Sequence, residues 1–224
     1  MRLCVINGSP RAGRGNTAVM TEHFAAGFVS IPDNEVRYLF LARKKAYSGF
    51  YDQVQFADVV LLAFPLFFIS MPGPVKVFLE ALPPGIGAGR QLVFLVQSGF
   101  PETEQFAPLV RYLETVPERF GFASGGIIVK GFGSSLESMP APLNRGDLRK
   151  FEALGRNCGQ GEILDSRILN EFGQPERLSP TGLALFQVMK KAGLLDSYTR
   201  AQFKKNGISP RSSLARPLAP SRER

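Results

Sequence analysis

A loop of small residues and hydrogen-bond donors near the N-terminus is the segment best suited to chemistry. Residues 8–17 follow the short apolar run 3–6 and precede a helical pattern. At such a junction, backbone N–H groups and the positive end of the helix dipole favour an anion. Arg11 supplies a cationic donor for such an anion, and Ser9, Asn16 and Thr17 supply neutral ones. The spacing predicts a phosphate site, and an ordinary glycine-rich connection is the alternative.

Two common phosphate loops do not match this segment. The ATP/GTP-type loop needs Lys-Ser or Lys-Thr after its second glycine, whereas Gly13 is followed by Arg14 and Gly15. The dinucleotide fingerprint Gly-x-Gly-x-x-Gly is also absent, because Ala18 stands where its third glycine would be. The remaining interpretation is a site for a single terminal phosphomonoester, as in FMN.

A second loop carries large apolar residues. It follows the apolar run 59–64 and includes Pro65, Leu66, Phe67, Phe68 and Ile69. Beside a phosphate loop, such residues form a wall for a flat aromatic ring, and the proline restricts the backbone. The alternatives are that the phenylalanines continue the core or cover a dimer interface.

A third loop follows the apolar run 91–97 and begins with Ser98, Gly99 and Phe100. Ser98 is suited to hydrogen-bonding a polar ring edge, and Gly99 permits close backbone approach. Phe100 is placed to pack beside the ring. A tight turn without a ligand is the alternative for this loop taken alone.

The elements that must position these loops alternate between strands and helices. Strands are predicted at Arg2–Asn7, Val36–Leu41, Asp58–Phe64, Gln91–Gln97 and Gly126–Lys130. Helices are predicted over Thr17–Phe28 with Asn16 as N-cap, from Pro74, and over Phe106–Phe120. The pattern predicts an α/β fold: a flavodoxin-like, doubly wound, five-stranded parallel sheet of order 2-1-3-4-5. Such sheets bind ligands beyond the carboxyl ends of the first and third strands.

The C-terminal part of the chain carries no further motif. We expect a single domain over residues 1–207, with a C-terminal helical appendage from about residue 132 that includes helices starting near Ser179 and Asp196. Residues 208–224 are predicted to be a mobile basic tail. Six of the eight net positive charges lie after residue 199, and residues 208–224 contain no aromatic residue. We therefore expect no nucleic-acid partner.

Composition narrows the class further. The chain has 224 residues, of which 44% are hydrophobic, but its longest apolar run, 59–68, is too short to span a membrane. The first strand starts too early to leave room for a signal peptide, and the two cysteines, Cys4 and Cys158, suggest neither disulfides nor a metal cluster. We expect a cytoplasmic protein without a metal site. His23, the only histidine, lies in the first helical pattern, where we expect a structural role, so no second histidine is left for a Ser-His-Asp triad.

The first two loops resemble those of NADPH-dependent FMN reductase-like flavoproteins. The third, residues 98–102, is similar to that of a branch allied to the iron–sulfur flavoproteins. The cysteine cluster of that branch is missing, because residues 42–47 contain no cysteine. Phe67 stands where a tyrosine is common, which removes a hydroxyl and leaves stacking.

The resemblance implies a role for each loop. Ser9, Arg11, Asn16 and Thr17 would hold the FMN phosphate, residues 65–69 would line the isoalloxazine, and residues 98–100 would meet its pyrimidine side. NADPH or NADH would reduce the flavin, which would pass the electrons to a quinone, free flavin or similar small-molecule acceptor. The flavin does the transfer, so no catalytic side chain is assigned. A homodimer is implied. The alternatives are a flavodoxin-like FMN electron carrier without NAD(P)H activity, and a non-enzymatic scaffold or regulatory protein.

Overall fold

In the computed structural model, the described residues are 1–43, 48–133, 136, 141–174, 187, 188, 191 and 193. The chain divides into two compact units, Met1–Glu176 and Arg177–Arg224. Every element below belongs to the first unit. The predicted tail, the helix from Asp196 and most of the helix from Ser179 lie outside the described residues.

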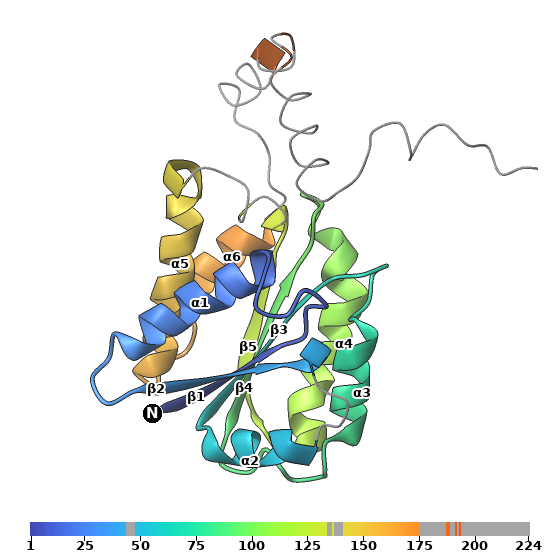
Figure 1. Ribbon diagram of the computed structural model, residues 1–224, viewed down its shortest axis with the longest axis vertical. Coiled ribbons are helices and arrows are strands. Elements are labelled where there is room, and N and C mark those ends of the chain that lie inside the picture. The colour runs from blue at the N-terminus through green and yellow to red at the C-terminus, as the bar shows by residue number, and fades with distance from the viewer. Residues whose placement is uncertain are drawn as a thin grey trace, which may run out of the picture. The chain divides into compact units, whose positions relative to one another are not determined.

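The first unit is built around one parallel sheet (Figure 1). Its strands are β1 (Arg2–Asn7), β2 (Glu35–Phe40), β3 (Val59–Pro65), β4 (Gln91–Gln97) and β5 (Ala123–Lys130). Their order is β2-β1-β3-β4-β5, which confirms the predicted topology. The order reverses between β1 and β3, so the loops that follow these strands start side by side.

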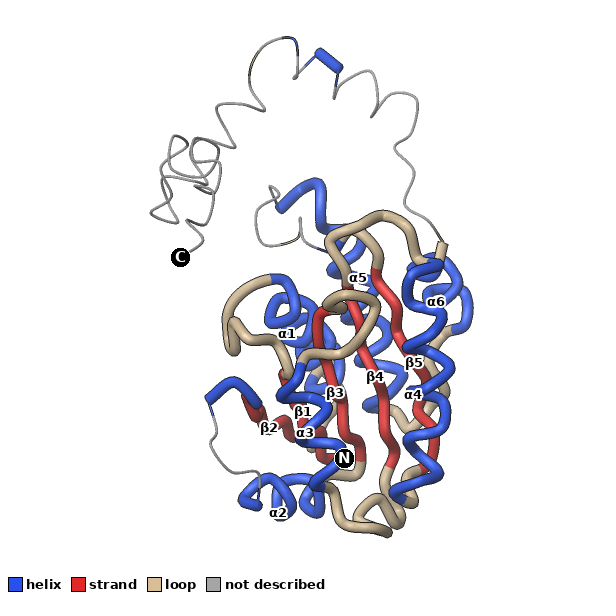
Figure 2. Tube along the Cα trace, turned by 90° about the vertical axis from the view of Figure 1, so that its right-hand side faces the viewer, coloured by secondary structure: helices blue, strands red, loops and turns tan. Residues whose placement is uncertain are grey.

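Helices cover both faces of the sheet because β1, β3 and β4 are buried on both sides. One apolar cluster joins the sheet to α2 (Ser48–Phe56), α3 (Gly73–Ala81) and α4 (Ala107–Phe120). A second joins the opposite face to α1 (Asn16–Val29), α5 (Ala141–Gly159) and α6 (Ser166–Gly173). Figures 1 and 2 show these layers. The described residues also include two single turns of 3-10 helix, Leu41–Arg43 and Glu104–Phe106.

Helix α5 is part of the layered core, in contact with α1. A Cβ atom on Gly155 would lie 1.8 Å from the carbonyl oxygen of Phe24, so the two backbones approach more closely than any other residue would allow. His23 Nδ1 of α1 also lies 2.7 Å from Glu152 Oε1 of α5. The segment predicted as an appendage therefore completes one face of the sheet, because β1 and β3 leave apolar rows there that α1 alone does not cover.

Several local predictions differ from the structure, and the bounds of β2 and β3 are each shifted by one residue. Strand β5 begins at Ala123 and not at Gly126, because the glycine pair 125–126 lies at an irregularity of the β4–β5 register and does not end the strand. Helices α2, α5 and α6 were not predicted individually. Gly15, not Asn16, occupies the N-cap of α1, and Asn16 is the first helical residue.

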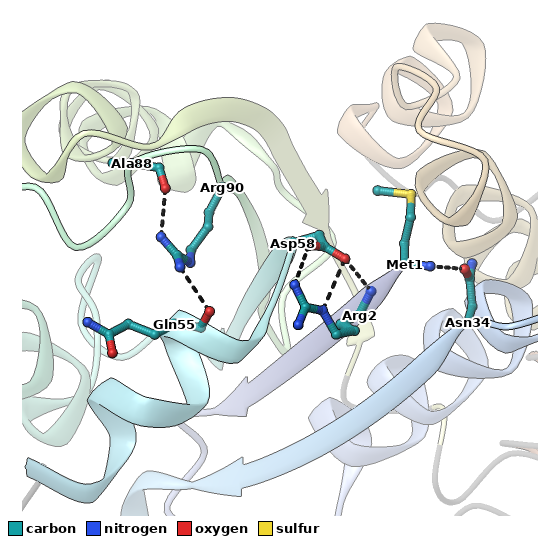
Figure 3. Close-up of polar contacts among 7 residues, drawn as sticks. All are labelled: Met1, Arg2, Asn34, Gln55, Asp58, Ala88 and Arg90. Atoms are coloured by element: carbon teal, nitrogen blue, oxygen red, sulfur yellow. Dashed lines mark hydrogen bonds and ion pairs between the residues drawn. The ribbon is translucent and has the colours of Figure 1, made fainter.

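The amino ends of the strands are held by a separate polar cluster (Figure 3). Arg2 Nη2 lies 2.9 Å from Asp58 Oδ1, and hydrogen bonding from this guanidinium lowers the pKa of the Asp58 carboxyl. Arg90 donates to the carbonyl oxygens of Ala88 and Gln55. These contacts fix the edge of the sheet opposite to the three loops singled out in the sequence. Among the described residues, no helix is long and apolar enough to cross a membrane.

Candidate functional site

The three loops singled out in the sequence meet in one pocket of about 230 Å³. The sheet explains why: Asn7 at the end of β1 pairs with Ala63, and Pro65 at the end of β3 pairs with Gln97 at the end of β4. Figure 2 shows the loops that follow these strands at one edge of the sheet. Of the twelve predicted residues, nine line the pocket: Ser9, Arg11, Asn16, Thr17, Pro65, Leu66, Phe67, Ser98 and Gly99.

The first loop is held by the side chain of Asn7. Its Oδ1 accepts from the backbone N–H of Ser9 at 2.9 Å, and its Nδ2 donates to the carbonyl oxygen of Ala12 at 3.1 Å. Gly8 N–H donates to the carbonyl oxygen of Ala63 at 2.7 Å. A Cβ atom on Gly8 would lie 2.2 Å from Val75 Cγ2, so only glycine fits between β3 and α3 here. The loop is thus fixed to the sheet before any ligand binds.

The positive charge of the pocket comes from Arg11 and the start of α1. Gly15, at the N-cap, has φ +83°, and a Cβ atom there would lie 3.0 Å from Arg11 Nη1. Arg11 therefore lies against the first turn of the helix. Ser9 and Thr17 are buried beside it. Among the described residues that line the pocket, Arg11 is the one charged side chain and none is acidic. This set of donors suits an anion.

The second loop gives the pocket its apolar wall, with Pro65, Leu66 and Phe67. Phe67 and Ser70 exchange two backbone hydrogen bonds around a turn whose central residues, Phe68 and Ile69, have φ +46° and +65°. Both positive values are those of a type I′ turn, which normally carries glycine or asparagine. Phe68 is fully exposed at the tip of this turn, and Ile69 lines a neighbouring hollow, so neither lines the pocket.

In the third loop the Ser98 hydroxyl is used by the loop itself. Ser98 Oγ accepts from the Phe100 N–H at 3.1 Å and from Gln105 Nε2 at 3.0 Å, and donates to the Phe100 carbonyl oxygen at 3.0 Å. Ser98 and Gly99 line the pocket, whereas Phe100 lies outside it and is exposed. Ser98 therefore shapes the loop, and its hydroxyl already has three partners there.

Two residues of the pocket were missed by the sequence analysis, Pro10 and Gln97. Pro10 stands inside the recognised motif but carries no side-chain donor. Gln97 is the last residue of β4 and was counted as strand. Its amide Nε2 lies 3.4 Å from Thr17 Oγ1, which links β4 to the first turn of α1. A polar residue at the end of a row of buried apolar ones was the available signal.

The third loop is supported from behind by β5 and α6. The Ser98 N–H donates to the carbonyl oxygen of Lys130, whose Nζ lies 3.0 Å from Asp147 Oδ2 of α5. Thr103 Oγ1 donates to the carbonyl oxygen of Gly173 at 2.7 Å. Burial lowers the pKa of Lys130, and the carboxylate of Asp147 acts in the opposite direction. Helices α5 and α6 therefore support the third loop, although they do not line the pocket themselves.

The remaining reactive groups lie away from the pocket. Burial raises the pKa of the Cys4 thiol to about 12 and that of Cys158 to about 12, so both thiols are inert at neutral pH. Among the described residues, no group of three or more histidine, cysteine, aspartate or glutamate side chains could hold a metal ion. Both cysteines therefore lie outside the set of residues that line the pocket.

Comparison with known proteins agrees with the loop motifs. Residues 1–102 match the family described as NADPH-dependent FMN reductase, and this stretch contains all three loops. The match confirms the resemblance predicted from the sequence. No curated protein matches the chain.

Solved structures confirm the fold. An FMN-dependent NADH-azoreductase from Bacillus anthracis, solved with FMN, has a TM-score of 0.57 at 12% identity, covering 71% of this chain and 100% of the other. An apo NADH:FMN oxidoreductase has a TM-score of 0.55 at 18% identity, covering 78% and 96%. An NAD(P)H:quinone oxidoreductase from Methanothermobacter marburgensis has a TM-score of 0.55 at 14% identity, covering 70% and 96%.

The chain therefore has a flavodoxin-like fold, and its residues 1–102, which hold the three loops, are similar to NADPH-dependent FMN reductases.

Proposed function

We propose that the pocket binds FMN, and that the protein passes reducing equivalents from NADPH or NADH through it to a quinone, free flavin or similar small acceptor. The observation that carries the proposal is the meeting of a donor-rich helix start with an apolar wall in one pocket. A phosphorylated aromatic ligand needs both features. Three structural neighbours whose names include FMN or quinone oxidoreduction support it.

The phosphate would lie in the first loop. Arg11 supplies a full charge, the start of α1 supplies a partial one, and Ser9, Asn16 and Thr17 supply neutral donors. Because Asn7 already fixes the loop, little ordering is needed when the ligand binds. The absence of acidic side chains among the described lining residues removes the repulsion that a dianion would otherwise meet.

The aromatic ring would lie between the second and third loops. Leu66 and Phe67 offer apolar surface, and Gly99 allows the backbone to approach the ring edge. Bound FMN supplies hydride and electron transfer. The residues of this chain bind and orient it and exclude water from one face. We therefore assign binding roles to the pocket residues and no proton-transfer step to a side chain.

The decisive experiment measures NADPH oxidation by the FMN-loaded protein with a quinone as acceptor. We expect turnover that depends on both FMN and quinone. Bound FMN without turnover on quinone or free flavin would indicate an electron carrier, and failure to bind FMN would indicate a scaffold. The Arg11→Ala variant should need more FMN for the same rate, whereas Arg14→Ala should behave as wild type, because Arg14 does not line the pocket.

We further propose that the protein is a homodimer in which the turn of residues 67–70 is covered by the partner. The turn exposes Phe67, Phe68 and Ile69 and holds two of them at positive φ. Exposed apolar patches of this kind are usually interfaces. Light scattering should report a dimer at micromolar concentration, weakened by Phe68→Asn but not by Ile163→Asn, a second exposed apolar site. A monomer that retains FMN would contradict this.

A cytoplasmic location completes the proposal. Its support is that Cys4 and Cys158, the two cysteines of the sequence, are free and buried, with no disulfide between them. Fractionation of the native cells, with the protein recovered in the cytoplasmic fraction, is the expected outcome.

A further inference from the structure

Gln97 occupies a position where the fold would accept an apolar residue. Side chains alternate between the two faces of β4, and Val93 and Leu95 lie in the apolar cluster beneath α1 and α5. Gln97 continues this row and is 7% exposed. A buried amide is costly unless its hydrogen-bonding groups are satisfied. Such a residue at the end of the strand therefore calls for an explanation beyond packing.

The hydrogen bonding of this amide is only half complete. Nε2 lies 3.4 Å from Thr17 Oγ1, and Oε1 has no hydrogen-bond partner among the described residues. Oε1 lies against Gly133, where an added Cβ atom would be 2.7 Å from it. The side chain of Gln97 is thus oriented so that Nε2 contacts Thr17, and this orientation leaves Oε1 without a hydrogen-bond partner among the described residues.

The contact determines what the Thr17 hydroxyl does. A hydroxyl that accepts a hydrogen bond from an amide keeps its own O–H for another acceptor. Thr17 is buried in the first turn of α1 and lines the pocket. Its O–H is therefore available to an acceptor oxygen in the pocket. A fully ionised phosphate, which offers acceptors and no donors, matches this polarity.

We propose that Gln97 is a positioning residue that sets the Thr17 hydroxyl as a donor to a ligand phosphate. It thereby makes the pocket selective for the phosphorylated form of its ligand. This inference rests on the proposed FMN function. A purely structural strut between β4 and α1 would instead affect phosphorylated and unphosphorylated ligands equally.

The test compares FMN with riboflavin, which lacks the phosphate, in fluorescence titrations of wild type, Gln97→Met, Gln97→Glu and Thr17→Val. Gln97→Met keeps the shape of the side chain and removes its donor. We expect FMN affinity to fall about three- to tenfold and riboflavin affinity to stay within about twofold. Gln97→Glu adds an acceptor for the Thr17 O–H and a negative charge, so FMN affinity should fall more than about tenfold.

A double-mutant cycle separates positioning from packing. In the Thr17→Val background, Gln97→Met should cause no further loss of FMN affinity, because the hydroxyl that it positions is gone. Gln91→Met, on the same strand but at its other end, is the matched control and should change neither affinity. Gln97→Met and Thr17→Val are both conservative in shape, so the cycle stands even where Gln97→Glu fails to fold.

Two results would overturn the inference. One is an equal loss for FMN and riboflavin in Gln97→Met, and the other is a full additive loss in the double variant. Either result leaves the proposed function intact if the wild-type protein binds FMN more tightly than riboflavin. A wild type that does not distinguish the two ligands would instead overturn the phosphate site itself, and this is seen before any variant is made.

Discussion

Replacing Asp147 by Asn should destabilise the protein strongly, because it removes the carboxylate that faces a buried cation. Lys130 is 2% exposed, and its Nζ lies 3.0 Å from Asp147 Oδ2. Breaking a buried ion pair by removing one partner costs about 3–5 kcal/mol. Asp147 is itself 31% exposed, so we expect the lower end, about 3 kcal/mol. For a chain of this size, that lowers Tm by about 6–12 °C.

The pH dependence gives a sharper signature. The Lys130 pKa is already lowered from 10.5 by burial, and loss of Asp147, which raises it, should lower it further. Between the folded-state pKa and that of the unfolded chain, the unfolded state binds more protons, so stability rises with pH. The deficit of Asp147→Asn should therefore be full below the folded-state pKa and shrink as the pH approaches 10.5.

Urea unfolding followed by circular dichroism, at neutral pH and again at alkaline pH, measures both effects. Glu80→Gln is the matched control, because it breaks the exposed Lys76–Glu80 pair and should leave the free energy of unfolding close to that of wild type. If Asp147→Asn unfolded within about 0.5 kcal/mol of wild type, or with a deficit independent of pH, the Lys130 charge would not depend on this carboxylate.

Three further predictions test the loops and the core. Arg11→Ala should lower FMN affinity about ten- to hundredfold in a fluorescence titration while leaving riboflavin affinity nearly unchanged, because one charge-assisted contact is lost. Gly8→Ala should cost about 1–3 kcal/mol in urea unfolding, because its Cβ would lie 2.2 Å from Val75 Cγ2. The thiols of Cys4 and Cys158 should react with an aromatic disulfide at least about a hundredfold more slowly in the folded than in the unfolded protein, because burial raises the pKa of each thiol to about 12.

Each of these has an outcome that would contradict it. Equal losses of FMN and riboflavin affinity in Arg11→Ala would show that the phosphate does not bind at Arg11. A stable Gly8→Ala variant would mean that Val75 moves freely. Gly146→Ala is its control, since an added Cβ there meets nothing within 4 Å and alanine favours helix α5. If the thiols reacted at the same rate before and after unfolding, the structure around Cys4 in β1 and Cys158 in α5 would have to open readily to the reagent.

Much of the fold could be predicted because its signals are local. Strands β1 and β4 have the predicted bounds, Arg2–Asn7 and Gln91–Gln97, since runs of buried apolar residues end at polar ones. The order of the sheet follows from alternating strands and helices. The start of β5 was wrong because the glycine pair 125–126 is typical of a turn when read locally, and only the register with β4 shows otherwise.

The site was predictable in its loops but not in its supports. The first loop is a contiguous motif, so all four of its nominated residues reach the pocket. The second loop turns back after Phe67 in a tight turn that its sequence does not signal, which places Phe68 at the tip. The contact of Gln97 with Thr17 joins residues 80 positions apart, and no local pattern reports it.

The most direct test of the central claim is a calorimetric titration of the purified wild-type protein with FMN and with riboflavin. The account predicts one FMN per chain, bound at least about tenfold more tightly than riboflavin, because Arg11, Thr17 and the start of α1 recognise the phosphate. No binding of FMN, or equal affinities for the two ligands, would contradict a flavin mononucleotide site in this pocket.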